Sequence, residues 1–145
     1  MSWLLRLLAM GGLWKKLSGT YQQTTTGIRQ AKSFASGVME KHVQSTLEQA
    51  EMGDREAIFE MAERFYEGRG VPMDYEIAAG WFLKAAELGH TKAQTNLGMM
   101  LWIGRGCTRD RETALHWIKT AAKKQYEPAQ ELLLEIRKKH GGNTR

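Results

Sequence analysis

The side chains that could do chemistry are few and scattered along the sequence. The four histidines, His42, His90, His116 and His140, include no pair at the spacing that places two metal ligands on one helix face. The chain has one cysteine, Cys107, and no recognisable general base accompanies it, as a catalytic thiol requires. We therefore predict no metal site, no cofactor and no catalytic residue.

Two Gly-Arg-Gly segments, 68–70 and 104–106, are a further candidate, because glycine-rich loops can bind phosphate. A phosphate-binding loop needs a longer glycine pattern between a strand and a helix, and neither segment has one. A turn that requires positive φ angles explains these glycines better. Arg69 and Arg105 would then form a small basic edge.

Composition indicates a small helical domain. A chain of 145 residues can bury a hydrophobic core without covalent links, and a single cysteine cannot form an intramolecular disulfide. The chain has only two prolines and many strong helix formers, which favours helix over strand. The formal charge of +5 is small and much of it lies near the C-terminus, so nucleic acid is disfavoured as a partner.

The sequence repeats itself with a period of 36 residues. At that shift, 11 of the 37 pairs from 57/93 to 93/129 are identical, where unrelated sequences would give about two. The identical pairs are Ala57/Ala93, Gly68/Gly104, Arg69/Arg105, Gly70/Gly106, Asp74/Asp110, Glu76/Glu112, Ala78/Ala114, Trp81/Trp117, Ala85/Ala121, Ala86/Ala122 and Ala93/Ala129. Repetition at such a period is typical of stacked repeat architectures.

Each unit has the pattern of two helices joined by a glycine turn. In the first unit, apolar residues recur at i, i+4 and i+8 over 54–67, which predicts a helix that ends at Gly68. Asp74 is placed to N-cap a second helix that runs to about Leu88 and stops at Gly89. The second unit repeats the scheme, with helices predicted over 91–103 and 110–124.

Partial units flank the two full ones. Residues 37–52 match the second helix of an earlier, degenerate unit, and residues 128–139 begin a third unit with a polar outer face. A helix pair of this size cannot bury both of its faces alone, so such units stack. We therefore predict an all-α fold, an α-solenoid of helix-turn-helix repeats over 37–145, preceded by a separate segment and linker over 1–36.

The order of residues in the units resembles the Sel1-like repeat, a relative of the tetratricopeptide repeat with a longer inter-helix turn. In the second unit the resemblance is carried by Ala93, Leu97, Gly98, Gly104, Gly106, Asp110, Ala114, Trp117, Ala121 and Ala122. Two full repeats begin at about residues 54 and 90. The departures are Ala62, where the family usually has glycine, and Cys107-Thr108 in the turn. The resemblance implies a scaffold that holds other proteins together, often in bacterial envelope assembly, secretion or signalling.

Candidate partner-binding residues lie off the packing face of the first helices, which line the concave surface of a solenoid. In the second unit these residues are Asn96, Met99 and Met100, and methionine is favoured at adaptable binding surfaces. We predict that they form a partner groove together with Arg64. The alternative is that the methionines pack beneath the next helix.

The first 17 residues carry an apolar stripe at helical spacing, with Lys15 and Lys16 beside it. The stripe consists of Trp3, Leu7, Met10, Trp14 and Leu17. The apolar stretch is shorter than the roughly 20 residues of a spanning helix and lacks the basic start and cleavage site of a signal peptide. We predict that it anchors the chain at a membrane interface or on a partner. An atypical export signal and a helix packed on the solenoid are the alternatives.

These patterns together favour a bacterial protein–protein interaction scaffold or adaptor over any enzyme. We expect it to bind a partner protein or peptide through its solenoid surface, in the bacterial cytoplasm or peripherally at the inner membrane. A membrane-associated structural component and an immunity-type protein that neutralises an effector are alternatives. An enzyme is the weakest of them, because no acid, base or nucleophile set is recognisable.

Overall fold

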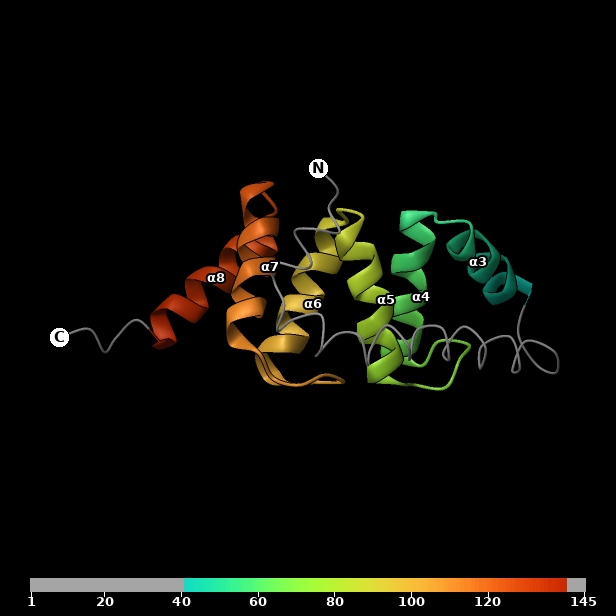
Figure 1. Cartoon of the computed structure of the whole chain (residues 1–145), viewed down its shortest axis with the longest axis horizontal. Coiled ribbons are helices and arrows are strands. Elements are labelled where there is room, and N and C mark those ends of the chain that lie inside the picture. Colours follow the sequence, from blue (N-terminus) through green and yellow to red (C-terminus); the bar gives the residue numbers. More distant parts are fainter. Residues whose placement is uncertain (1–40, 141–145) are drawn as a thin grey trace, which may run out of the picture.

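The computed structural model describes residues 41–140, which form six α-helices and no strand (Figure 1). The helices are α3 (Lys41–Glu51), α4 (Arg55–Glu67), α5 (Tyr75–Glu87), α6 (Thr91–Ile103), α7 (Arg111–Lys123) and α8 (Glu127–His140). Both full repeats have the predicted helices, within a residue or two at each end. The predicted all-α solenoid is therefore confirmed.

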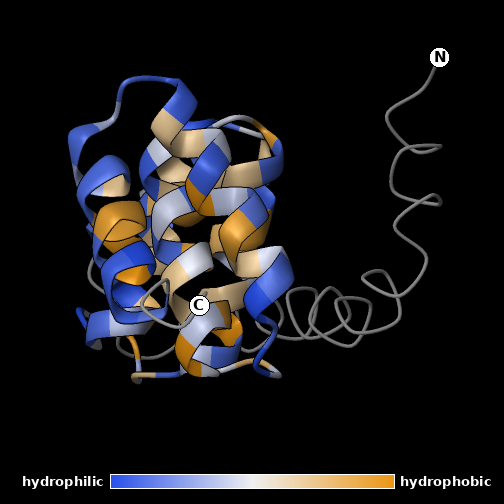
Figure 2. Ribbon diagram, turned by 90° about the vertical axis from the view of Figure 1, so that its left-hand side faces the viewer, coloured by the Kyte–Doolittle hydropathy of each residue, from blue (hydrophilic) through white to orange (hydrophobic). Residues whose placement is uncertain are grey.

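The helices stand in one row, in which each packs against its neighbours in sequence (Figure 1). The pairs α4–α5 and α6–α7 are the two repeats, with α3 at one end of the row and α8 at the other. Figure 2, a view along the row, shows both hydrophobic and hydrophilic residues on the helices. Such amphipathic helices bury their apolar stripes against one another, so the core runs along the row as a continuous layer.

Small residues at repeated positions bring the helices close together. The buried alanines that recur at the 36-residue period are Ala57, Ala93 and Ala129, then Ala78 and Ala114, then Ala85 and Ala121. Large side chains fill the space between these contacts, and Trp81 and Phe82 are fully buried. Trp117, at the position of Trp81 in the second repeat, is only half-buried against the core.

The predicted helix caps are present in both repeats. The Asp74 carboxylate accepts hydrogen bonds from the first-turn amides of α5, and Asp110 does the same at α7. These caps satisfy amides that have no partner within the helix. Gly68 and Gly104 end α4 and α6 with φ of 72° and 76°, a left-handed conformation that a side chain would disfavour.

His90 joins the two repeats. It is the N-cap of α6, where its Nδ1 accepts a hydrogen bond of 3.2 Å from the amide of Ala93. The other ring nitrogen, Nε2, lies 3.0 Å from the Glu56 carboxylate in α4, so Nε2 carries the hydrogen and donates it. The ring also stacks on Phe59 of α4, with 4.1 Å between centroids. One side chain therefore holds the first turns of α4 and α6 together.

Close helix contact also explains a difference between the repeats. A Cβ atom at Gly98 would lie 2.6 Å from Ile118 Cγ1 and 3.1 Å from the carbonyl oxygen of Ala114, both in α7. The equivalent position in the first repeat is Ala62, which is fully buried and accommodated. The departure from the family's glycine at position 62 therefore leaves the packing of α4 on α5 intact.

We predict that Gly98→Ala lowers the free energy of unfolding by about 1–3 kcal/mol, because the added methyl group overpacks the α6–α7 contact. The loss would occur although alanine favours a helix over glycine by about 1 kcal/mol. Urea unfolding followed by circular dichroism measures it. In a double-mutant cycle, Ile118→Ala should cost less in the Gly98→Ala background than in wild type. Unchanged or increased stability of the single variant would contradict this account.

We predict that His90→Ala destabilises the chain by about 2 kcal/mol, since it removes a helix cap worth about 1 kcal/mol and a ring stack of similar size. Asp54→Ala is the matched control, because Asp54 caps α4 through the amide of Ala57 and makes no ring stack. Its expected cost is about 1 kcal/mol. Equal losses for the two variants, measured by urea unfolding, would show that His90 acts as a cap alone.

Candidate protein-binding cleft

A cleft of about 140 Å³ lies between α4 and α6, the first helices of the two repeats. Its lining residues are Glu63, Tyr66 and Glu67 from α4, Phe82 from α5, and Asn96, Met99 and Met100 from α6. We call it the α4–α6 cleft. It forms because the first helices of adjacent repeats stand apart on one side of the row, with α5 packed between and behind them.

Three of the four predicted partner-binding residues line this cleft together. Asn96 is half-buried, and the side chain of Met99 is 45% exposed. Met100 is only 2% exposed and contributes the part of its surface that faces the cleft. Met99 is therefore the methionine that offers surface to a partner, whereas Met100 also belongs to the core.

Arg64 does not line the cleft, although the sequence groups it with the other three. It is 7% exposed, and its Nη2 lies 2.7 Å from the Glu60 carboxylate in the same helix. Its Nη1 donates a 3.3 Å hydrogen bond to the carbonyl oxygen of Arg69 in the turn after α4. Arg64 thus braces this turn against the helix.

Opposite charges lie along the α4 side of the cleft. The Arg69 Nε lies 2.6 Å from a carboxylate oxygen of Glu67, and its Nη2 lies 3.5 Å from one of Glu63. All three side chains are substantially exposed, so solvent screens these pairs and each contributes little to stability. One guanidinium between two carboxylates leaves this rim with a net negative charge.

Tyr66 connects the cleft to the turn of the second repeat. Its ring contacts the rings of Tyr75 and Phe82 at centroid distances of 5.2 and 6.2 Å. Its hydroxyl accepts a 2.7 Å hydrogen bond from Nη1 of Arg105. Tyr66 therefore has an apolar ring in the cleft and a polar end held by the neighbouring repeat.

The sequence analysis did not predict the role of Tyr66 and Phe82 in the cleft. Both are aromatic residues in the packing pattern, and Phe82 is indeed buried. One sequence feature could have indicated this role. Tyr66 and its equivalent Trp102 are aromatic in both repeats, and each lies one residue after the row of apolar residues that faces the core. A residue at that edge is half-buried, so part of its ring faces outward.

The residues considered for catalysis or metal binding gain no support from the geometry. Burial raises the pKa of the Cys107 thiol to about 11, so it is protonated at neutral pH and is a poor nucleophile. Burial also raises the pKa of the Glu87 carboxyl. Within residues 41–140 no three His, Cys, Asp or Glu side chains lie together as metal ligands would.

The predicted anchoring residues Trp3, Leu7, Met10, Trp14 and Leu17 lie outside the described residues. Among the helices of residues 41–140, none is long and apolar enough to cross a membrane.

Two family matches cover the paired helices. The Sel1 repeat model matches residues 55–90 and again residues 91–126, which are the α4–α5 and α6–α7 pairs. A search of curated proteins finds no match.

Several solved structures are similar to this chain. A Sel1 repeat protein from Oxalobacter formigenes is similar at 36% identity and a TM-score of 0.59, over 60% of this chain and 25% of that one. A protective antigen of uropathogenic Escherichia coli with an SLR fold is similar at 26% identity and a TM-score of 0.59, over 75% and 28% of the two chains. The chain thus spans about a quarter of the length of these two proteins.

Cysteine rich protein B of Helicobacter pylori has a TM-score of 0.60 over 83% of this chain and 94% of its own. At 18% identity that likeness concerns the fold alone. Sel1 repeats generally mediate protein–protein interaction and are of a non-enzymatic scaffold type. The two matched repeats, their stacked helix pairs and these structural relatives together show that the chain is a Sel1-repeat protein.

Proposed function

We propose that this protein is a scaffold that holds a segment of a partner protein in the α4–α6 cleft. The observation that carries the proposal is the exposed side chain of Met99 beside the half-buried ring of Tyr66, over a floor formed by Phe82 and Met100. An apolar side chain from a partner would remove this surface from water, which is favourable. Methionine adapts its shape to such a ligand, because its side chain is unbranched and flexible.

The size of the cleft supports a protein segment over a small-molecule ligand. Pockets for cofactors and drug-sized ligands usually enclose roughly 300–1,000 Å³. The α4–α6 cleft has about 140 Å³ and is open to solvent. It therefore suits one anchoring side chain of a longer segment, with the remaining contacts spread along the exposed faces of α4 and α6.

We predict that Met99→Glu abolishes capture of the specific partner from the native host's lysate, including solubilised membranes. The new carboxylate would be buried beside Glu63 and Glu67 on binding, which opposes complex formation. Leu88→Glu is the matched control: Leu88 is 49% exposed, close to the 45% of Met99, and lies at the end of α5 outside the cleft. Quantitative mass spectrometry compares what the three proteins retain.

A protein enriched by wild type and by Leu88→Glu but lost with Met99→Glu supports the proposal. With that partner purified, the Met99 variant should bind about tenfold more weakly or worse, a loss of about 1.4 kcal/mol. If Met99→Glu keeps its circular dichroism spectrum and melting temperature and still retains every specific protein, the cleft is not the binding site. Met100 is unsuitable for this test, because a charge at its buried position would disrupt the core.

A further inference from the structure

The turns of the two repeats share a backbone but differ in charge. In both turns the amide of the capping aspartate donates to a carbonyl nine residues earlier, from Asp74 to Phe65 at 2.9 Å and from Asp110 to Leu101 at 3.0 Å. The side chains around this shared frame are different. Positions 73 and 75 hold Met and Tyr in the first repeat, and the equivalent positions of the second repeat hold Arg109 and Arg111.

The acidic residues change in the opposite sense. In the first repeat, Glu63 and Glu67 pair with Arg69, but their equivalents in the second repeat are Met99 and Ile103. Arg105, the equivalent of Arg69, therefore lacks the counterparts of these two carboxylates. The ion pairs found within residues 41–140 involve the first-repeat arginines and two histidines, and none involves an arginine of the second turn.

Two of the three arginines, Arg105 and Arg111, lie on aromatic side chains. The Arg105 guanidinium carbon is 5.9 Å from the centre of the Tyr66 ring and 5.2 Å from that of Tyr75. The guanidinium carbon of Arg111 is 5.1 Å from the ring centre of Trp102. These cation–π contacts hold the side chains in place without neutralising their charge.

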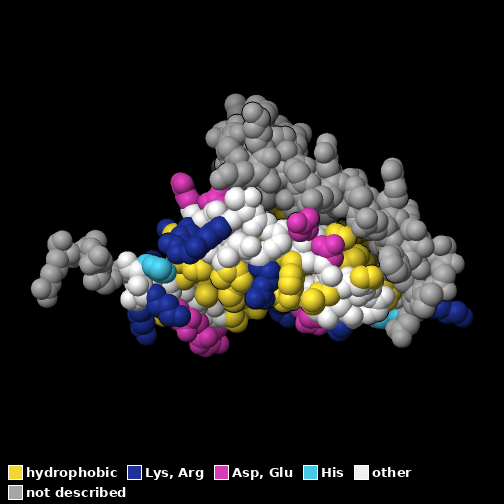
Figure 3. All heavy atoms as spheres, turned by 90° about the horizontal axis from the view of Figure 1, so that it is seen from below, with side chains coloured by type: hydrophobic (Ala, Val, Ile, Leu, Met, Phe, Trp, Pro, Cys, Tyr) yellow, Lys and Arg dark blue, Asp and Glu magenta, His cyan; other side chains and the backbone are white. Residues whose placement is uncertain are grey.

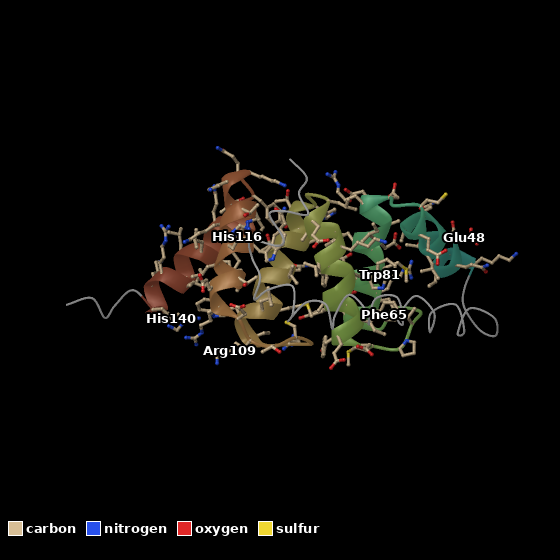
Figure 4. All side chains as sticks on the ribbon, in the orientation of Figure 1. Glu48, Phe65, Trp81, Arg109, His116 and His140 are labelled. Carbon is tan, nitrogen blue, oxygen red and sulfur yellow. The ribbon has the colours of Figure 1, made fainter. Side chains whose placement is uncertain are left out.

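Two further basic residues contact Trp102. The Arg109 Nε donates a 3.2 Å hydrogen bond to the carbonyl oxygen of Trp102, and the His140 ring meets the Trp102 indole edge-on at 5.3 Å. His140 ends α8, whose last turn also carries Arg137, Lys138 and Lys139. Figure 4 shows Arg109 and His140 at the same corner of the molecule, and Figure 3 shows Lys and Arg side chains gathered at the C-terminal end. We call Arg105, Arg109, Arg111, Trp102 and His140 the arginine surface.

Folding alone does not explain this arrangement. Arg111 is the first residue of α7, where the positive end of the helix dipole disfavours a cation. Neighbouring unpaired cations also repel one another. The first repeat shows that the same turn forms with an apolar residue at position 73 and an aromatic one at position 75. The charges are therefore available to a ligand.

We propose that the arginine surface binds an acidic segment of a partner protein. The inference rests on the proposed function in one respect, that the ligand is a protein. Planar guanidinium groups bind carboxylates through paired, charge-assisted hydrogen bonds. Arg105 donates to the Tyr66 hydroxyl, and the Tyr66 ring lines the α4–α6 cleft, so the arginine surface and the cleft are continuous. A partner segment with an apolar anchor followed by acidic residues fits both.

The aromatic rings favour protein over single-stranded nucleic acid as the ligand. A nucleic-acid surface of this kind needs free ring faces on which bases can stack. Arg111 lies over Trp102, and Arg105 lies against both Tyr66 and Tyr75. The rings therefore position the arginine side chains, and the guanidinium groups are what contacts the ligand.

Fluorescence polarisation of a labelled octaglutamate peptide, titrated with the full chain, tests the proposal. We expect Arg105→Gln, Arg109→Gln and Arg111→Gln combined to weaken binding about tenfold or more, since several charge-assisted hydrogen bonds are lost. The matched control combines Lys92→Gln, Lys119→Gln and Lys123→Gln, which removes the same charge at exposed positions outside the arginine surface. It should change the affinity by less than about threefold, an effect of overall charge alone.

A site-specific signal accompanies the affinity. The peptide should shift the Trp102 indole N–H resonance, assigned through Trp102→Phe, and leave that of the buried Trp81 in place. Equal weakening by both triple variants, or an unmoved Trp102 signal, would overturn the proposal. Tighter binding of an eight-nucleotide uridine RNA, or of phosphatidylserine vesicles that depends on the same arginines, would overturn it in favour of those ligands.

The two proposals can be tested independently of each other. Octaglutamate has no apolar side chain to enter the cleft, so its binding reports on the arginine surface alone. If the peptide binds as expected while Met99→Glu retains every partner, the cleft assignment is wrong and the arginine surface stands.

Discussion

The close approach of helices over small residues is the constraint on which the rest of the structure depends. Buried alanines at three repeated positions let neighbouring helices meet along the row, and Gly98 brings α6 still closer to α7. Interiors are packed nearly as densely as organic crystals, so a single methyl group at such a contact is felt. The spacing of the helices, and with it the position of the α4–α6 cleft, follows from these small side chains.

Most of the fold could be predicted from the sequence, because the residues that stacking requires recur at a fixed period. The alanines, the capping aspartates and the helix-ending glycines recur every 36 residues, and each has one physical task that only a few residue types perform. His90 is the exception in this set. It stands 36 residues after the cap Asp54, but a histidine at that position does not reveal the contacts of its ring with Glu56 and Phe59 in the preceding repeat.

The cleft was harder to predict, since helical periodicity finds the centre of a buried face and not its edge. Arg64 and Met100 occupy equivalent edge positions, and both are buried, one by an ion pair and one by the core. Met99, one residue earlier than Met100, is exposed. Whether an edge residue faces a partner or a neighbour depends on the helix beside it, which is a tertiary property. The arginine surface was beyond prediction for a similar reason, because Trp102 and His140 meet only after α6 and α8 have packed around α7.

The joint at His90 has a consequence for how such a chain can evolve. Its backbone closes one repeat, its ring contacts Glu56 and Phe59 within that repeat, and its side chain caps the first helix of the next. A duplication of 36 residues in this register would insert a complete block and preserve the existing joints. Genetic gain or loss of whole blocks could then lengthen or shorten the binding face, whereas an insertion of any other length within the helices would break the register of the row.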